Sequence, residues 1–63
     1  MNKIEIIKTI KQLAMSQGYY CRLYNDLMYY AKHDPFNFND YMSRLENKNF
    51  KTTLDIVLYF EGE

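Results

Sequence analysis

The fold is decided by residues 20–31, which read YCRLYNDLMYYA. Apolar and aromatic side chains recur there at the spacing i, i+3, i+4, i+7, i+8 and i+11, which is typical of one face of an α-helix. They are Tyr20, Leu23, Tyr24, Leu27, Met28 and Ala31. We therefore expect a helix over about residues 18 to 32, with Lys32 and His33 at its C-terminal end. Asp34-Pro35 ends it, because the residue before a proline disfavours the helical conformation.

The segment before it predicts a first helix over about residues 3 to 15. Its apolar side chains also recur at helical spacing, and they are Ile6, Ile7, Ile10, Leu13 and Ala14. A short turn should separate the two helices, since Gly18 is able to adopt a positive φ and Ser16 is able to cap the helix that follows.

Two more helices are expected after Pro35. Asn37 is the expected N-cap of the first, which ends near Asn47 and has apolar positions at Phe38, Tyr41, Met42 and Leu45. The second should begin at Thr52, because Asp55 three residues later completes the pattern of a capping box. Residues 54–60 are apolar enough that a β-strand is the alternative. The fold class is therefore all-α, a single domain over residues 1–63 folded as a compact bundle of three to four short helices.

The composition excludes several classes of protein. Hydrophobic residues make up 48% and charged residues 25%, which is ordinary for a globular domain. Eight basic residues balance eight acidic ones, so no net charge draws the chain to nucleic acid or to an anionic membrane. No apolar run approaches the ~20 residues that span a bilayer. The single cysteine cannot form an internal disulfide, so we expect a cytoplasmic protein.

Catalysis is not expected. An enzyme needs polar groups that converge, and the one His, one Cys and scattered carboxylates show no spacing typical of a triad or a metal site. Cys21 and His33 are more than three turns apart on the same predicted helix, so they cannot meet. We expect no cofactor, metal or small-molecule substrate, and we expect Cys21 to pack as a small apolar side chain.

The tyrosines instead predict a binding surface. Aromatic residues make up 17% of the chain, and Tyr19, Tyr29 and Tyr30 fall outside the main stripe of the second helix. So small a core should not bury all three, and exposed Tyr beside Arg is typical of interface hot spots. We therefore predict that Tyr19, Arg22, Tyr29 and Tyr30 bind a partner protein or a second copy of the chain in a homodimer. The alternative is a bundle so compact that both faces of this helix are packed.

Residues 13–18, LAMSQG, leave a second function open. They resemble the helix-turn-helix pattern, in which a Leu-Ala pair is followed by a turn glycine four residues after the alanine. The resemblance implies a DNA-binding regulator whose recognition helix presents Arg22 and Asn25. Asp26 and the neutral net charge disfavour it, because phosphate contacts supply much of the affinity of DNA-binding proteins.

Two stretches, SQGYYCRL over residues 16–23 and NFKTTLDIVL over residues 49–58, resemble short uncharacterised proteins of bacteriophages and mobile elements in Gram-positive bacteria. The resemblance implies a helical cytoplasmic product of a phage or prophage and carries over no functional residue. Small proteins in that setting commonly bind and modulate larger host or phage proteins of replication, transcription or defence. Together with the tyrosines, this predicts a small helical protein-interaction module.

Overall fold

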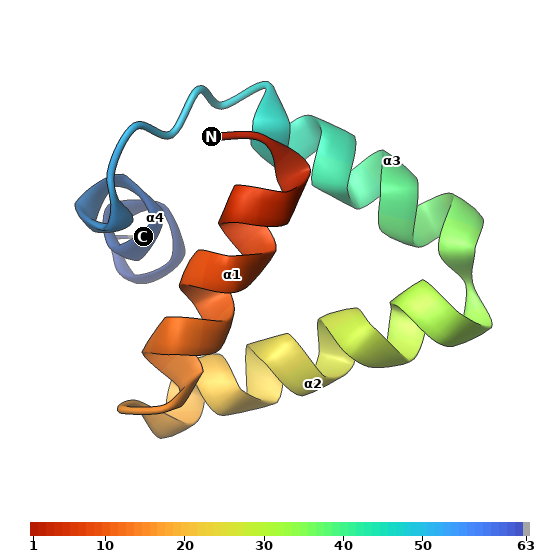
Figure 1. Ribbon diagram of the computed structural model, residues 1–63, viewed down its shortest axis with the longest axis horizontal. Helices are drawn as coiled ribbons and strands as arrows, with labels where there is room; N and C mark the ends of the chain where they lie inside the picture. Colours follow the sequence, from red (N-terminus) through yellow and green to blue (C-terminus); the bar gives the residue numbers. More distant parts are fainter. Residues whose placement is uncertain (63) are drawn as a thin grey trace.

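The computed structural model describes residues 1–62, and within them it contains four α-helices and no strand. The helices are α1 (Lys3–Ala14), α2 (Gly18–His33), α3 (Pro35–Glu46) and α4 (Thr53–Glu61). In Figure 1, α1, α2 and α3 form the three sides of a triangle, and α4 lies beside α1. The prediction of an all-α bundle is confirmed, and the alternative of a strand over residues 54–60 is wrong.

Capping boxes begin the first and the last helix. At α1, the Asn2 side chain accepts a hydrogen bond from the Glu5 backbone at 2.8 Å, and the Glu5 carboxylate accepts one from the Asn2 backbone at 3.0 Å. At α4, Thr52 and Asp55 form the same reciprocal pair, as the sequence predicts. These side chains satisfy backbone N–H groups that have no partner within the helix, so they define where each helix starts.

The third helix begins earlier than expected, and the prediction of Asn37 as its N-cap is wrong. Asp34 is the N-cap, and its side chain accepts a hydrogen bond from the Asn37 backbone at 3.4 Å. Pro35 then occupies the first helical position, where its missing N–H costs nothing. One residue therefore ends α2 and begins α3, and Phe36 lies in the helix instead of a loop.

The turn between α1 and α2 also differs in detail from the prediction. Gln17 is the N-cap of α2 and makes no capping hydrogen bond through its side chain. The Ser16 hydroxyl points back and donates to the Leu13 carbonyl at 3.2 Å, so it closes α1 and does not cap α2. Gly18 is the first residue of α2 and does not have a positive φ.

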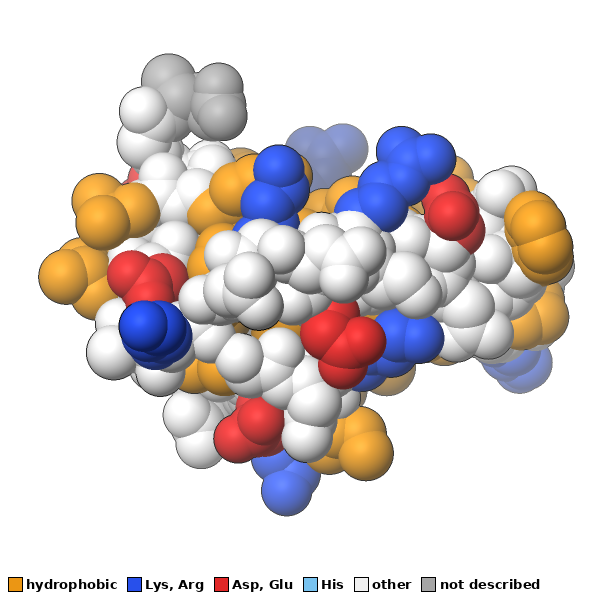
Figure 2. Space-filling model, turned by 90° about the horizontal axis from the view of Figure 1, so that it is seen from above, with side chains coloured by type: hydrophobic (Ala, Val, Ile, Leu, Met, Phe, Trp, Pro, Cys, Tyr) orange, Lys and Arg blue, Asp and Glu red, His pale blue; other side chains and the backbone are white. Residues whose placement is uncertain are grey.

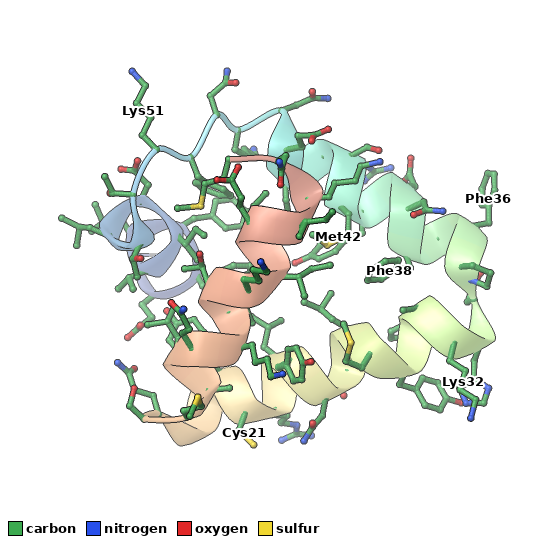
Figure 3. The ribbon with its side chains drawn as sticks, viewed as in Figure 1. Cys21, Lys32, Phe36, Phe38, Met42 and Lys51 are labelled. Atoms are coloured by element: carbon green, nitrogen blue, oxygen red, sulfur yellow. The ribbon has the colours of Figure 1, made fainter. Side chains whose placement is uncertain are left out.

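The core lies where the four helices meet. Its buried apolar side chains are Ile6, Ile10, Tyr20, Leu27, Met42, Leu45, Phe50 and Ile56. Figure 3 shows Phe38 and Met42 pointing from α3 into the space that α1, α2 and α3 surround. Two long-range hydrogen bonds hold the C-terminal part in place: the Met1 amino group donates to the Phe50 carbonyl, and the Tyr20 hydroxyl donates to the Glu61 carboxylate.

Candidate partner-binding surface

The four residues predicted to bind a partner lie on the solvent side of α2. Tyr19, Tyr29 and Tyr30 are 56%, 58% and 51% exposed, and Arg22 is exposed as well. With 3.6 residues per turn, these positions fall within about a third of the helix circumference. The predicted exposure of the tyrosines is confirmed, and the alternative of an α2 packed on both faces is wrong. The same side of α2 also carries Asp26.

A groove opens between this side of α2 and the helix that follows. It has a volume of about 290 Å³ and is lined by Leu23, Asp26, Leu27, Tyr30, Asn37, Phe38 and Tyr41. Its surface is almost entirely apolar, and its size is at the small end of ligand pockets, which start at ~300 Å³. Among the predicted binding residues, only Tyr30 lines the groove, while Tyr19, Arg22 and Tyr29 lie around it on α2.

Sequence reasoning missed the half of the groove that α3 supplies. The spacing of Phe38 and Tyr41 predicted core positions, yet Phe38 is half-buried and Tyr41 is 36% exposed. Only Met42 and Leu45 of α3 are buried. A signal for the groove was present in the sequence of α3, which has more apolar and aromatic side chains than the two that its core contact buries. The remaining aromatic side chains are therefore candidates for a surface.

The polar groups of the groove include several free acceptors. Asp26 makes no hydrogen bond or ion pair within residues 1–62. The Asn37 amide nitrogen donates one N–H to the Asp34 carboxylate at 2.7 Å, so its carbonyl oxygen and its second N–H are left over for another partner. Burial raises the pKa of Tyr41, and the neighbouring phenols of Tyr59 and Tyr19 raise it further, so this hydroxyl stays protonated at neutral pH.

A second, more polar hollow continues the surface on the far side of Tyr41. It is lined by Tyr41, Arg44, Leu45, Asn47, Lys48 and Tyr59. Its cations are already engaged, since Arg44 pairs with Asp40 at 3.0 Å and the Lys48 ammonium lies 5.4 Å from the centre of the Tyr59 ring. Tyr41 borders both hollows, so one continuous surface runs from α2 across α3 towards α4.

Aromatic side chains also gather at the corner where α2 meets α3. The Tyr29 ring lies 4.3 Å from the His33 ring and 5.6 Å from the Tyr30 ring, measured between centroids. Phe36 is 81% exposed, and Figure 3 shows it pointing away from the bundle. His33 occupies the last turn of α2, as expected. This corner extends the apolar surface beyond the end of the groove.

For the helix-turn-helix alternative, the predicted DNA-binding residues are exposed, but they carry little positive charge. Arg22 and Asn25 are both exposed. However, Asp26 lies one turn from Arg22, and the Asn25 amide contacts the Cys21 sulfur at 3.8 Å. Within residues 18–26, Arg22 is the one basic side chain and Asp26 is the one acidic side chain. Figure 2 shows a different face, viewed from the side of α3, and basic and acidic side chains are interspersed there too. An attraction to phosphates therefore has little basis on the solvent side of α2.

Cys21 corrects a further expectation, because its thiol is exposed and not packed. It follows Tyr20, which is fully buried, and each step along a helix turns the side chain by about 100°. That step carries position 21 away from the core, and Figure 3 shows the side chain on the outer side of α2.

Residues 1–62 contain no group of three or more His, Cys, Asp or Glu side chains arranged to hold a metal ion. None of the four helices is long and apolar enough to cross a membrane. In comparisons with known proteins, no family model, no curated protein and no solved structure matches this chain.

Proposed function

We propose that this protein is a small helical interaction module that binds a larger protein and modulates it, and that it carries out no catalysis. The observation that supports the proposal is the apolar groove between α2 and α3 with exposed tyrosines around it. Apolar patches bordered by polar groups are typical of protein-binding sites. We define the binding face as Tyr19, Arg22, Tyr29 and Tyr30 together with the groove.

The chemistry of this face suits a protein partner. A tyrosine brings a large, rigid apolar area with a polar tip, so it gains from burial without leaving an unsatisfied group. Arg22 adds a second residue type that is enriched among interface hot spots. The mixed charges on the solvent side of α2 favour a specific, shape-dependent partner over a polyanion.

The proposal includes a biological setting. We place the protein in the cytoplasm, as the product of a phage or mobile element of Gram-positive bacteria, which is the setting implied by the resemblance of residues 16–23 and 49–58. The partner is then a host or phage protein of replication, transcription or defence. A second copy of the chain is the alternative occupant of the face, and it would give a homodimer.

Site-specific photocrosslinking tests the binding face directly. A photoreactive phenylalanine replaces Tyr30 in one variant and Leu58 in a matched control, since both side chains are more than half exposed and only Tyr30 lies on the face. We expect position 30 to crosslink a discrete protein in nuclease-treated host cells and position 58 not to. A complex that needs intact DNA and dissociates steeply with salt would instead support the helix-turn-helix alternative.

The purified partner then allows the affinity to be measured. Tyr30→Ala should weaken binding by about 30-fold, which corresponds to about 2 kcal/mol for a hot-spot residue. Leu58→Ala should change the affinity by less than about twofold, because surface contacts outside an interface are near neutral. Equal effects of the two substitutions in calorimetry would rule out the α2–α3 face as the binding surface.

A further inference from the structure

The groove between α2 and α3 has a chemical character that selects its occupant. Three aromatic rings and two leucines form an apolar lining, and a single carboxylate, Asp26, stands among them. We propose that this groove receives an arginine side chain of the partner protein, carried on an apolar segment, and that Asp26 pairs with its guanidinium. This inference rests on the proposed function and names the residue that the partner must present.

The negative charge of Asp26 is not compensated within the described part of the chain. Within residues 1–62 its carboxylate has no ion-pair partner, and Arg22, one turn earlier on the same helix, does not approach it within ion-pair distance. Arg44 is held by Asp40 at 3.0 Å, and Lys48 lies over the Tyr59 ring. Asp26 is exposed in the free protein, and a partner that covers the groove would remove water from its carboxylate, so a partner that supplies a cation of its own is favoured.

The groove offers hydrogen-bond acceptors to an incoming side chain. The Asp26 carboxylate and the Asn37 carbonyl oxygen accept only, while the Asn37 amide nitrogen donates one N–H to Asp34 and keeps its second N–H. The Tyr30 and Tyr41 hydroxyls can accept as well. A guanidinium offers five N–H donors and no acceptor, so it complements this set.

The aromatic rings of the groove favour arginine over lysine. A guanidinium is planar, weakly hydrated and able to stack on aromatic rings, whereas an ammonium is compact and strongly hydrated. Tyr30, Phe38 and Tyr41 supply such rings within one groove. The volume of about 290 Å³ has room for one long side chain, while Leu23 and Leu27 would contact the apolar residues beside it.

An NMR titration of the full chain tests the inference with defined peptides. The probes are Ac-Leu-Arg-Leu-NH2 and its Gln, Lys and Glu counterparts. We expect the Arg peptide to shift the amide signals of residues 23–30 and 37–41 saturably, and to bind about tenfold more tightly than the Gln peptide. Asp26→Asn should abolish that tenfold preference. Asp40→Asn, which removes an exposed carboxylate outside the groove, should retain it.

The outcomes separate this inference from the proposed function. Equal binding of the Arg and Gln peptides, or an unchanged preference in Asp26→Asn, would overturn the arginine assignment, and so would the absence of shifts in the groove. In each of those cases, crosslinking from position 30 would still report whether the face binds a protein. Loss of that crosslinking would defeat the proposed function whatever the peptides do.

Discussion

At the scale of single residues, Tyr20 is the side chain that connects the last helix to the rest of the protein. Its ring is fully buried, packs edge-to-face against Phe60 at 6.4 Å between centroids, and carries a hydroxyl that donates to the Glu61 carboxylate at 2.5 Å. Burial and this carboxylate raise the pKa of Tyr20, so the hydroxyl remains a donor. Tyr20→Phe should therefore keep the packing and destabilise the fold by about 1 to 3 kcal/mol in urea denaturation.

A double-mutant cycle identifies the cause of that loss. If the hydrogen bond is responsible, Glu61→Ala combined with Tyr20→Phe should cost less than the sum of the two single substitutions. Tyr29→Phe is the matched control, because it removes a hydroxyl from a tyrosine that is 58% exposed. Additive effects of Tyr20→Phe and Glu61→Ala would show that the two side chains do not act through their contact.

The exposure of a side chain was predictable from its position on a helix. Predictions that relied on residue type alone were less accurate. The exposure of Tyr19, Tyr29 and Tyr30 followed from their place on the helix, because the 3.6-residue repeat fixes which side each one faces. Cys21 was expected to be packed because free cysteines usually are, but its position turns it outward. The residue type of Asn37 favours a helix cap, but the preceding Asp34-Pro35 pair already starts α3.

At the scale of helices, the N-terminus of α4 depends on a carboxylate. Asp55 accepts hydrogen bonds from the Lys51 and Thr52 backbone at 2.8 and 3.1 Å, and these bonds lower the pKa of Asp55. A carboxyl group whose pKa is lower in the folded state stabilises the fold above its unfolded pKa of about 3.9. That stabilisation disappears as the pH falls through the folded pKa.

Asp55→Asn should therefore lower the melting temperature at pH 7, and the difference from the wild type should shrink as the pH falls below about 4. Circular dichroism melts across this range make the measurement. Asp26→Asn provides the comparison, because that carboxylate caps no helix. A difference between wild type and Asp55→Asn that stays constant down to pH 2 would show that Asp55 stabilises α4 without its charge.

The helices themselves were largely predictable, and α4 shows why. Residues 54–60 are a short apolar run that suits a strand as well as a helix, so hydrophobicity could not decide between them. Thr52 and Asp55 decided it, because a capping box satisfies backbone groups only at the start of a helix. Local hydrogen bonding of this kind depends on a few neighbouring residues, so a sequence reveals it.

At the scale of the whole molecule, the groove could not be predicted because two helices make it jointly. The sequence pattern indicates which side of α2 or α3 is apolar, but not how closely the two helices approach. Asp34 ends one helix and begins the next, so α2 and α3 meet at a corner (Figure 1), and side chains of these two helices line the groove. Phe38 and Tyr41 therefore line a surface, and Phe38 also packs beside the core.

The same arrangement predicts uneven stability across the molecule. The helices α1, α2 and α3 pack closely on one another, whereas α4 buries only Ile56 fully in the core. Its Tyr59 and Phe60 pack against the core from the edge, and the hydrogen bond from Tyr20 to Glu61 holds it to α2. Regions with fewer buried contacts open locally before the whole protein unfolds. Native-state hydrogen exchange should therefore give lower opening free energies for the amides of residues 57–61 than for those of residues 7–10.

Substitution of Tyr20 tests whether its hydrogen bond attaches α4 to the rest of the protein. Tyr20→Phe should accelerate exchange in residues 57–61 more than in residues 7–10, because the lost hydrogen bond attaches α4 and not α1. Tyr29→Phe should change neither set, since its hydroxyl is on the opposite side of α2 from the contact with Phe60. If both sets of amides exchange with one free energy and respond equally to Tyr20→Phe, the four helices unfold as a single cooperative unit and α4 is as firmly attached as the other three.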